Sequence, residues 1–312
     1  MNALDSSIMS GKLEAKERKS SSGYGRPPWI FKGSALYQLH LVKADTVRAI
    51  IPKELKIVEA FGYTLGGFFL ANYEDSPVGS FDEVSTNPSF KFTLVVISGI
   101  VWNPPTSCAW ATRVLVSSQD ACSHGRKAVG LPSQVATFSK KIAPIPMHLR
   151  EGKLSSFFSS VGVAESTSDK NISMDVEVTE TTGYSFSDHC NIKITRPIPA
   201  MISEKGMMGP EIKMSLPSFS GRTEHNANLL KYSCAIRCRL RPVKPAAISR
   251  ISPATQTNQE DLFKDEYQSK SLNLSTLVML SKPIFAVEFN CLTMQVEAPI
   301  TVSHGSHLSE KS

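Results

Sequence analysis

The chain has 312 residues, a net charge of +6 and 41% hydrophobic residues. That length allows one large β domain or two smaller domains, and that apolar content can bury a sizeable core. The charge is modest and the basic residues are scattered, whereas a nucleic-acid-binding protein typically carries a basic stripe with interleaved aromatic residues. We therefore expect no nucleic-acid partner.

Membrane-spanning and metal-binding classes also find little support. No run reaches the roughly 18 apolar residues of a spanning helix, so we expect a soluble protein that is not transmembrane. None of the six cysteines forms a Cys-x-x-Cys pair, and the seven histidines show no metal-ligand spacing. We expect no metal and no cofactor. The cysteines are interpreted as reduced, in an intracellular and by default cytoplasmic protein, and a plastid location stays open.

The chain is expected to divide into one domain and two tails. Residues 1–22 are polar and lack periodicity, which predicts a disordered extension, and residues 303–312 are predicted to be a disordered tail. Residues 23–302 are predicted to form a single domain. Within it, residues 242–270 are rich in proline and then in polar and charged residues, which predicts an exposed loop or insertion.

The first half of the domain is interpreted as a meander of strands. Period-two alternation predicts a strand at 37–41, in which His40 points opposite the apolar side chains and is expected to be solvated. A short helix is predicted at 44–51, with Val47 and Ile51 on its apolar face. Further strands are predicted at 63–73, 90–102, 109–116 and 135–141.

The second half repeats this pattern. Residues 172–178 alternate cleanly, with an apolar and an acidic face. Further strands are predicted at 191–195, 211–216 and 230–240, with 285–289 and 292–296 as a final pair. Many strands, few helices and no βαβ alternation predict an all-β to β-rich α+β fold. An antiparallel β-barrel removes exposed edges and can enclose a ligand.

Residues 121–136, with the sequence ACSHGRKAVGLPSQVA, form a turn-rich corner. Ser123 can cap a short helix, Gly130 can end it in the left-handed region, and Pro132 forbids further helix. A strand is then expected from Val135. Such a corner places polar residues beside a buried strand, so it is either a purely structural turn or the border of a site.

The motif Gly-Arg-x-x-x-Gly-x-Pro at 125–132 resembles the Gly-Arg-Glu-x-x-Gly-x-Pro-Lys-Lys segment of the acetoacetate decarboxylase family. Residues 76–83 resemble that family's Gly-x-Tyr-x-Glu segment. Further matches, in the family's N-terminal order, lie at 28–31, 37–41, 47–52 and 55–57. The resemblance covers residues 25–140 well and the rest by strand pattern. It implies a partly closed antiparallel β-barrel with a few short helices.

The resemblance implies four candidate pocket residues, Glu83, Arg126, Ser133 and Gln134. The family's decarboxylases use the first lysine of Pro-Lys-Lys to form a Schiff base with a keto acid, and the second lysine and burial lower its pKa. Ser133 and Gln134 stand at these two positions. A serine hydroxyl forms no imine, and glutamine carries no charge that lowers a neighbour's pKa. We expect a pocket without the decarboxylase chemistry, and no residue is assigned as catalytic.

Within the family, the chain resembles a plant group required for forming neoxanthin from violaxanthin, in xanthophyll and abscisic acid biosynthesis. The first hypothesis is an accessory or ligand-binding protein that holds a xanthophyll or another apolar small molecule. A full C40 carotenoid is about 30 Å long, near the span of a ~20-residue helix. We therefore expect a single small barrel to hold only an end group.

Two alternatives remain open. An enzyme with altered chemistry, such as an epoxide rearrangement, can use Glu83 as a general acid or base and Arg126 to hold an oxygen. The same two residues can instead form a structural ion pair. The other alternative is a scaffold that steadies another pathway enzyme through its N-terminal segment or residues 242–270. The sequence does not predict an oligomeric state.

Overall fold

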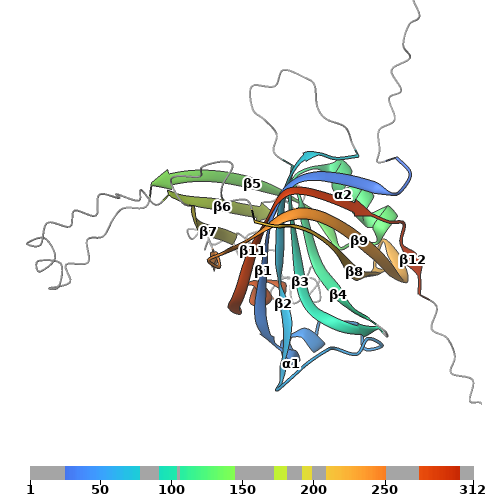
Figure 1. Ribbon diagram of the computed structural model, residues 1–312. Coiled ribbons are helices and arrows are strands. Elements are labelled where there is room, and N and C mark those ends of the chain that lie inside the picture. Colours follow the sequence, from blue (N-terminus) through green and yellow to red (C-terminus); the bar gives the residue numbers. More distant parts are fainter. Residues whose placement is uncertain are drawn as a thin grey trace, which may run out of the picture.

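The computed structural model of the chain describes residues 25–77, 91–103, 106–144, 172–180, 192–198, 209–250 and 274–302. Strands make up most of these residues and the helices are short (Figure 1), which confirms the β-rich class. The tails expected at 1–22 and 303–312 lie outside the described residues, and so does the candidate site residue Glu83.

Seven strands close into a barrel. They are β1 (Trp29–Lys43), β2 (Tyr63–Asp75), β3 (Lys91–Asn103), β4 (Thr106–Val116), β8 (Glu211–Thr223), β9 (Asn226–Val243) and β11 (Lys282–Val296). The first four form the predicted antiparallel meander. β8 joins β4 by a short parallel pairing and pairs with β9, and β11 pairs with both β9 and β1. The pairing of β11 with β1 closes the ring and confirms the predicted barrel.

A second, smaller sheet extends sideways from β4 (Figure 1). It contains β5 (Ser133–Pro144), β6 (Ile172–Glu180), β7 (Ile192–Ile198) and β10 (Ala247–Arg250). β5 begins in parallel pairing with the end of β4, and the remaining pairs are antiparallel. An exposed loop or insertion was predicted for 242–270, but residues 247–250 within it form the strand β10, which pairs with β7. The short β12 (Ile300–Thr301) pairs with β9.

The middle of the barrel sheet is covered on both faces. Inside the barrel, Phe69 and Phe289 belong to one buried cluster. On the outer face, Phe68 packs in a second cluster that includes Val176 of the smaller sheet. Strands buried on both faces have apolar side chains at successive positions, which accounts for the apolar run in β2.

The outer face of β1 also buries two polar side chains. His40 is only 1% exposed, so the prediction of a solvated strand residue is wrong. The Nε2 atoms of His40 and Gln38 lie 2.9 Å apart. Gln38 also accepts from the backbone nitrogen of Ala246 at 2.7 Å and donates to its oxygen at 3.1 Å. A chain segment far away in the sequence covers this face, and the local alternation carries no sign of it.

Two further elements differ from the predictions in extent. α1 (Ala44–Arg48) buries Val47 as its apolar spacing predicts, and Ile51 is buried just beyond the helix end. The final two predicted strands are one strand, β11. It is irregular near Cys291, which has a φ of 51° where the register with β9 shifts.

The corner at 121–136 consists of α2 (Gln119–His124) and one π-helical turn, Gly125–Val129. The N-cap is Ser118, whose hydroxyl accepts from the Ala121 backbone nitrogen at 3.1 Å, so the prediction of Ser123 as the cap is wrong. Gly130 ends the turn with a φ of 68°, as predicted. β5 then starts at Ser133, which places this residue at the junction of corner and sheet.

We expect Gly130→Val to lower the free energy of unfolding by at least about 1 kcal/mol, because a branched residue is strained at this positive φ. An added Cβ would also lie 2.7 Å from the Leu230 Cδ1 atom. Thermal melts can compare it with Gly25→Val, where an added Cβ meets nothing within 4 Å. Equal melting temperatures for the two variants would contradict the strained corner.

Stability should fall as the pH falls from about 6.5 to about 4. Burial lowers the pKa of His40 from 6.5 to about 4, against the opposing effect of hydrogen bonds with the backbone of Ser281 and Val278. In that window the unfolded chain binds the proton more tightly, so its protonation favours unfolding by up to about 1.4 kcal/mol per pH unit. Urea unfolding measured across this pH range should show that the free energy of unfolding depends less steeply on pH in His40→Gln than in the wild type. The same slope in both proteins would contradict the burial of a neutral His40.

Candidate functional site

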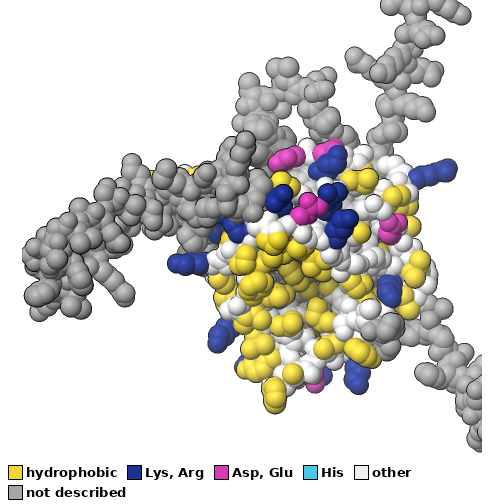
Figure 2. Space-filling view, viewed as in Figure 1, with side chains coloured by type: hydrophobic (Ala, Val, Ile, Leu, Met, Phe, Trp, Pro, Cys, Tyr) yellow, Lys and Arg dark blue, Asp and Glu magenta, His cyan; other side chains and the backbone are white. Residues whose placement is uncertain are grey.

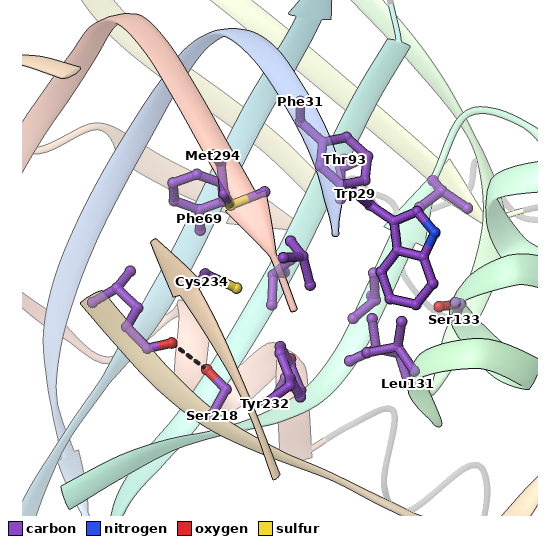
Figure 3. A pocket seen from close by; sticks show the side chains of 18 of the residues that line it. Trp29, Phe31, Phe69, Thr93, Leu131, Ser133, Ser218, Tyr232, Cys234 and Met294 are labelled. Atoms are coloured by element: carbon purple, nitrogen blue, oxygen red, sulfur yellow. Dashed lines mark hydrogen bonds between the residues drawn. The ribbon is translucent and has the colours of Figure 1, made fainter. Parts of the chain in front are cut away.

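The barrel encloses a cavity of about 170 Å³ (Figure 3). All seven barrel strands contribute to its lining, and the corner and the start of β5 close one part of it. The lining residues are Trp29, Phe31, Tyr37, Phe69, Tyr73, Thr93, Val95, Ile97, Ala109, Ala111, Val114, Val116, Ala121, His124, Gly125, Val129, Leu131, Ser133, Leu216, Ser218, Tyr232, Cys234, Ile236, Met294 and Val296.

The size of side chains around the barrel leaves this space open. β1 and β2 contribute rings, among them Phe31 and Tyr73, whose centroids lie 5.0 Å apart. β4 contributes the small side chains of Ala109 and Ala111. Large rings on one side and alanines on the other leave a void that the described side chains do not fill. A cavity lined in this way suits an apolar ligand.

The titratable groups of the lining favour their neutral forms. Burial lowers the pKa of His124 to about 4, so its ring is uncharged at pH 7. Burial raises the pKa of Tyr37 and of Tyr232, and it raises the pKa of Cys234 to about 12. The lining contains no Lys, Arg, Asp or Glu among the described residues. The described cavity wall therefore carries no net charge near pH 7.

Ser133 places a hydroxyl at the cavity wall. Its side chain is 2% exposed, and its Oγ has no hydrogen-bond partner within the described part of the chain. Figure 3 shows it beside Trp29 and Leu131. Trp29 in turn makes an edge contact with His124, with ring centroids 4.6 Å apart. The buried Ser133 hydroxyl is thus available to a ligand in the cavity.

The backbone of Ser133 is held by the corner. The Nε atom of Arg126 donates to the Ser133 carbonyl oxygen at 2.7 Å, and the Cys122 thiol donates to the same oxygen at 3.3 Å. An added Cβ at Gly125 would lie 2.4 Å from the Ser133 Oγ atom, so a side chain there would displace the hydroxyl. Arg126 itself is outside the cavity lining. Its guanidinium positions the start of β5.

Gln134 points away from the cavity, as expected for the residue after Ser133 in a strand. Its Oε1 atom accepts from the Nε atom of Arg113 at 3.3 Å, and Arg113 forms a buried ion pair with Glu180. Of the four predicted pocket residues, only Ser133 lies in the described lining. Glu83 lies outside the described residues, so its pairing with Arg126 stays a prediction.

The sequence analysis missed most of the lining, including Trp29, His124 and Tyr232. The alternation of side chains along β9 could have indicated one of them. Tyr232 lies on the same face of β9 as Cys234 and Ile236, which also line the cavity. Trp29 and His124 come from a strand end and a helix end, where alternation does not apply. Their proximity depends on how the corner docks.

The described ranges contain neither a metal-binding cluster nor a membrane-spanning helix. No three His, Cys, Asp or Glu side chains gather there as a metal-binding group would. None of the helices described is long and apolar enough to cross a bilayer.

Comparison with known sequences decides the family. The chain is 57% identical over 305 residues to Protein NEOXANTHIN-DEFICIENT 1 of Solanum lycopersicum, covering 95% of this chain and 99% of the relative. It is 53% identical over 298 residues to the protein of the same name from Arabidopsis thaliana, covering 93% and 99%. The chain belongs to the NEOXANTHIN-DEFICIENT 1 family. No protein-family model matches it.

The NEOXANTHIN-DEFICIENT 1 fold has a counterpart among solved structures. Acetoacetate decarboxylase from Legionella pneumophila superposes with a TM-score of 0.52 at 11% identity, covering 96% of this chain and 98% of that enzyme. At this identity the likeness concerns the fold alone. It confirms the barrel type that the corner motif implied.

Acetoacetate should form no trappable adduct with this protein. Ser133 offers a hydroxyl and no amine, and no lysine lines the described cavity. Borohydride reduction in the presence of acetoacetate, followed by intact-mass analysis, should leave the mass unchanged, while a decarboxylase that keeps the lysine pair serves as the positive control. A reduced adduct on Lys127 or Lys140 would refute this expectation.

Proposed function

We propose that this chain acts in neoxanthin biosynthesis as a non-decarboxylating accessory factor that binds the end group of a xanthophyll in its barrel. The family to which it belongs is named for a deficiency of neoxanthin. The observation that carries the proposal is the cavity itself, which has no charged side chain in its described lining and a buried unpaired hydroxyl at Ser133.

The volume of the cavity matches one ring. An engineered apolar cavity of about 150 Å³ binds benzene, whereas pockets for drug-sized ligands occupy about 300–1,000 Å³. A cavity of about 170 Å³ therefore accommodates one six-membered end ring. The rest of a C40 chain has to lie elsewhere.

The polar groups of the lining suit a neutral oxygen on that ring. Ser133, Ser218 and Tyr232 supply hydroxyl groups, and Ser218 donates to the Leu216 carbonyl oxygen at 3.4 Å (Figure 3). A ligand hydroxyl or epoxide oxygen can accept from the Ser133 hydroxyl. Pairing that buried hydroxyl removes the cost of an unsatisfied polar group, about 1–3 kcal/mol.

Acid–base catalysis finds weaker support. Opening an epoxide needs an acid near the oxygen, and a neutral imidazole with a pKa of about 4 is a poor proton donor at pH 7 because little of it is protonated. The alternative is an enzyme that uses Glu83 and Arg126. The bond from Arg126 to the Ser133 carbonyl oxygen counts against it, because this bond holds the guanidinium behind the cavity wall, outside the described lining.

A cavity-filling substitution should abolish retention of violaxanthin. Ala111→Phe places a ring in space that the ligand ring would occupy, and Ala143→Phe on the exposed part of β5 is the matched control. Purified protein is incubated with violaxanthin, separated from free pigment and assayed for bound pigment and for neoxanthin. We expect the wild type and Ala143→Phe to retain equal amounts of violaxanthin and to form no neoxanthin. Ala111→Phe should retain at least about tenfold less violaxanthin.

Each other outcome points to a different class of protein. Neoxanthin produced by the wild type would favour the enzyme, and then Glu83→Gln should stop its formation. Absence of retained pigment and of product would favour a scaffold for another pathway enzyme. Equal retention by both alanine variants would place the pigment outside the cavity.

A further inference from the structure

We infer that the inner face of the barrel sheet carries a binding surface for the polyene chain of the same ligand. We call it the apolar strip, and it consists of Leu39, Leu41, Leu65, Ile100, Trp102 and Phe285. The inference rests on the proposed function, because it names where the remainder of a C40 xanthophyll lies once one end ring occupies the cavity.

Strand register places the first half of the strip on the same face as the cavity lining. Tyr37 of β1 pairs with Phe69 of β2, and both line the cavity. The next pairs on this face are Leu39 with Gly67 and then Leu41 with Leu65. Paired residues of an antiparallel ladder point to one side of the sheet, and alternate residues share a face. The strip thus continues directly from the cavity wall.

The neighbouring strands extend the strip on both sides. In β3, Ile100 pairs with the cavity-lining Ala109 of β4, and Trp102 pairs with Ser107 two positions further. In β11, Phe285 pairs with Leu39. These positions lie on the inner face by the same rule of paired side chains. The strip therefore spans four neighbouring strands.

Three of the six strip residues are exposed and the other three are partly buried, whereas the apolar residues deeper in the barrel are buried. Leu65 is 41%, Phe285 47% and Trp102 49% exposed, whereas Phe69 is 7% exposed. Figure 2 shows hydrophobic side chains gathered over the lower parts of β11, β1 and β2, below the crossing of β8 and β9. An apolar surface of this kind on a protein marks a site of interaction.

The junction between cavity and strip has no bulky side chain on β2. Gly67 stands between Phe69 and Leu65 on the inner face, and an added Cβ there would lie 2.0 Å from the Gln38 carbonyl oxygen. Only glycine is compatible with this close approach of β1 and β2. The same glycine leaves the inner face flat where a chain would leave the cavity.

The length of the strip fits the ligand that the cavity cannot hold. From Tyr37 to Lys43, β1 advances about 20 Å at roughly 3.4 Å per residue. Added to the ring in the cavity, this covers most of a ligand about 30 Å long, the span of a ~20-residue helix. Lys43 and Tyr63 pair at the far end of the face, where a second hydroxylated ring would meet polar groups. This continuity with the cavity favours a bound ligand chain over a lipid surface or a second copy of the chain as the occupant.

The experiment compares violaxanthin with a one-ring analogue that keeps the hydroxylated epoxide end group and lacks the polyene. Affinities of both are measured by fluorescence quenching for the full chain, for Leu65→Glu and Phe285→Glu in the strip, and for Ile142→Glu as the control. Ile142 is 61% exposed on β5, away from the barrel's inner face. All substituted side chains are exposed, so each variant should fold, and circular dichroism verifies it.

We expect each strip variant to bind violaxanthin about ten- to a hundredfold more weakly, the loss that corresponds to leaving one large apolar side chain without its contact. The one-ring analogue should bind within about twofold of the wild type, and Ile142→Glu should bind both ligands normally. Unchanged violaxanthin affinity in both strip variants would overturn the inference, as would an equal loss for both ligands.

Two further outcomes separate the strip from the proposed function. If the one-ring analogue binds neither wild type nor variants, while violaxanthin binding depends on the strip, the ring-in-cavity proposal fails and the strip stands. If neutral-lipid vesicles bind the wild type and Leu65→Glu removes only vesicle binding, the strip faces a membrane and the inference is overturned. A wild-type dimer that Leu65→Glu converts to monomers, with violaxanthin binding unchanged, overturns it as well.

Discussion

The barrel depends on how the corner at 121–136 docks against the β8–β9 hairpin. β4 and β8 share only two register pairs, Ala109 with Ser218 and Trp110 with Phe219. The corner bridges the same region, because the Gly221 nitrogen donates to the Gly130 carbonyl oxygen at 2.9 Å and the Ser220 hydroxyl donates to the Val129 carbonyl oxygen at 2.6 Å. These bonds satisfy the orphan carbonyl groups at the helix end, and they fix the wall that carries Ser133.

The corner positions a backbone site without dictating its chemistry. The Arg126 guanidinium and the Cys122 thiol both bind the Ser133 carbonyl oxygen, so the Ser133 side chain enters the cavity whatever its identity. A lysine there offers an amine to a keto acid, and a serine offers a hydroxyl. Related barrels can therefore differ in reaction while sharing a fold, which is the general relation between folds and sites.

Alternation predicted the strands, and the left-handed φ open to glycine predicted the end of the corner at Gly130, because both are local signals. The barrel type followed from the resemblance of the corner motif. The sequence-based predictions were wrong where contacts with distant segments determine the local structure. The cap fell on Ser118 because the helix starts earlier than the motif suggested. His40 is buried because distant segments, around Ala246 and around Val278, cover this face of β1. The cavity lining could not be predicted, since alternation shows that a face is apolar but not which faces meet, nor that the space between them stays unfilled.

The uncharged lining of the cavity disfavours an anionic ligand. A keto acid carries a carboxylate, and burying that charge without a partner costs several kcal/mol. The described lining supplies no cation to offset this cost, and His124 is held neutral by the same burial. An uncharged ring with one or two oxygens meets no such penalty and can pair with the Ser133 hydroxyl. The described lining is therefore compatible with an uncharged ligand, whereas a buried carboxylate would meet an uncompensated desolvation cost there.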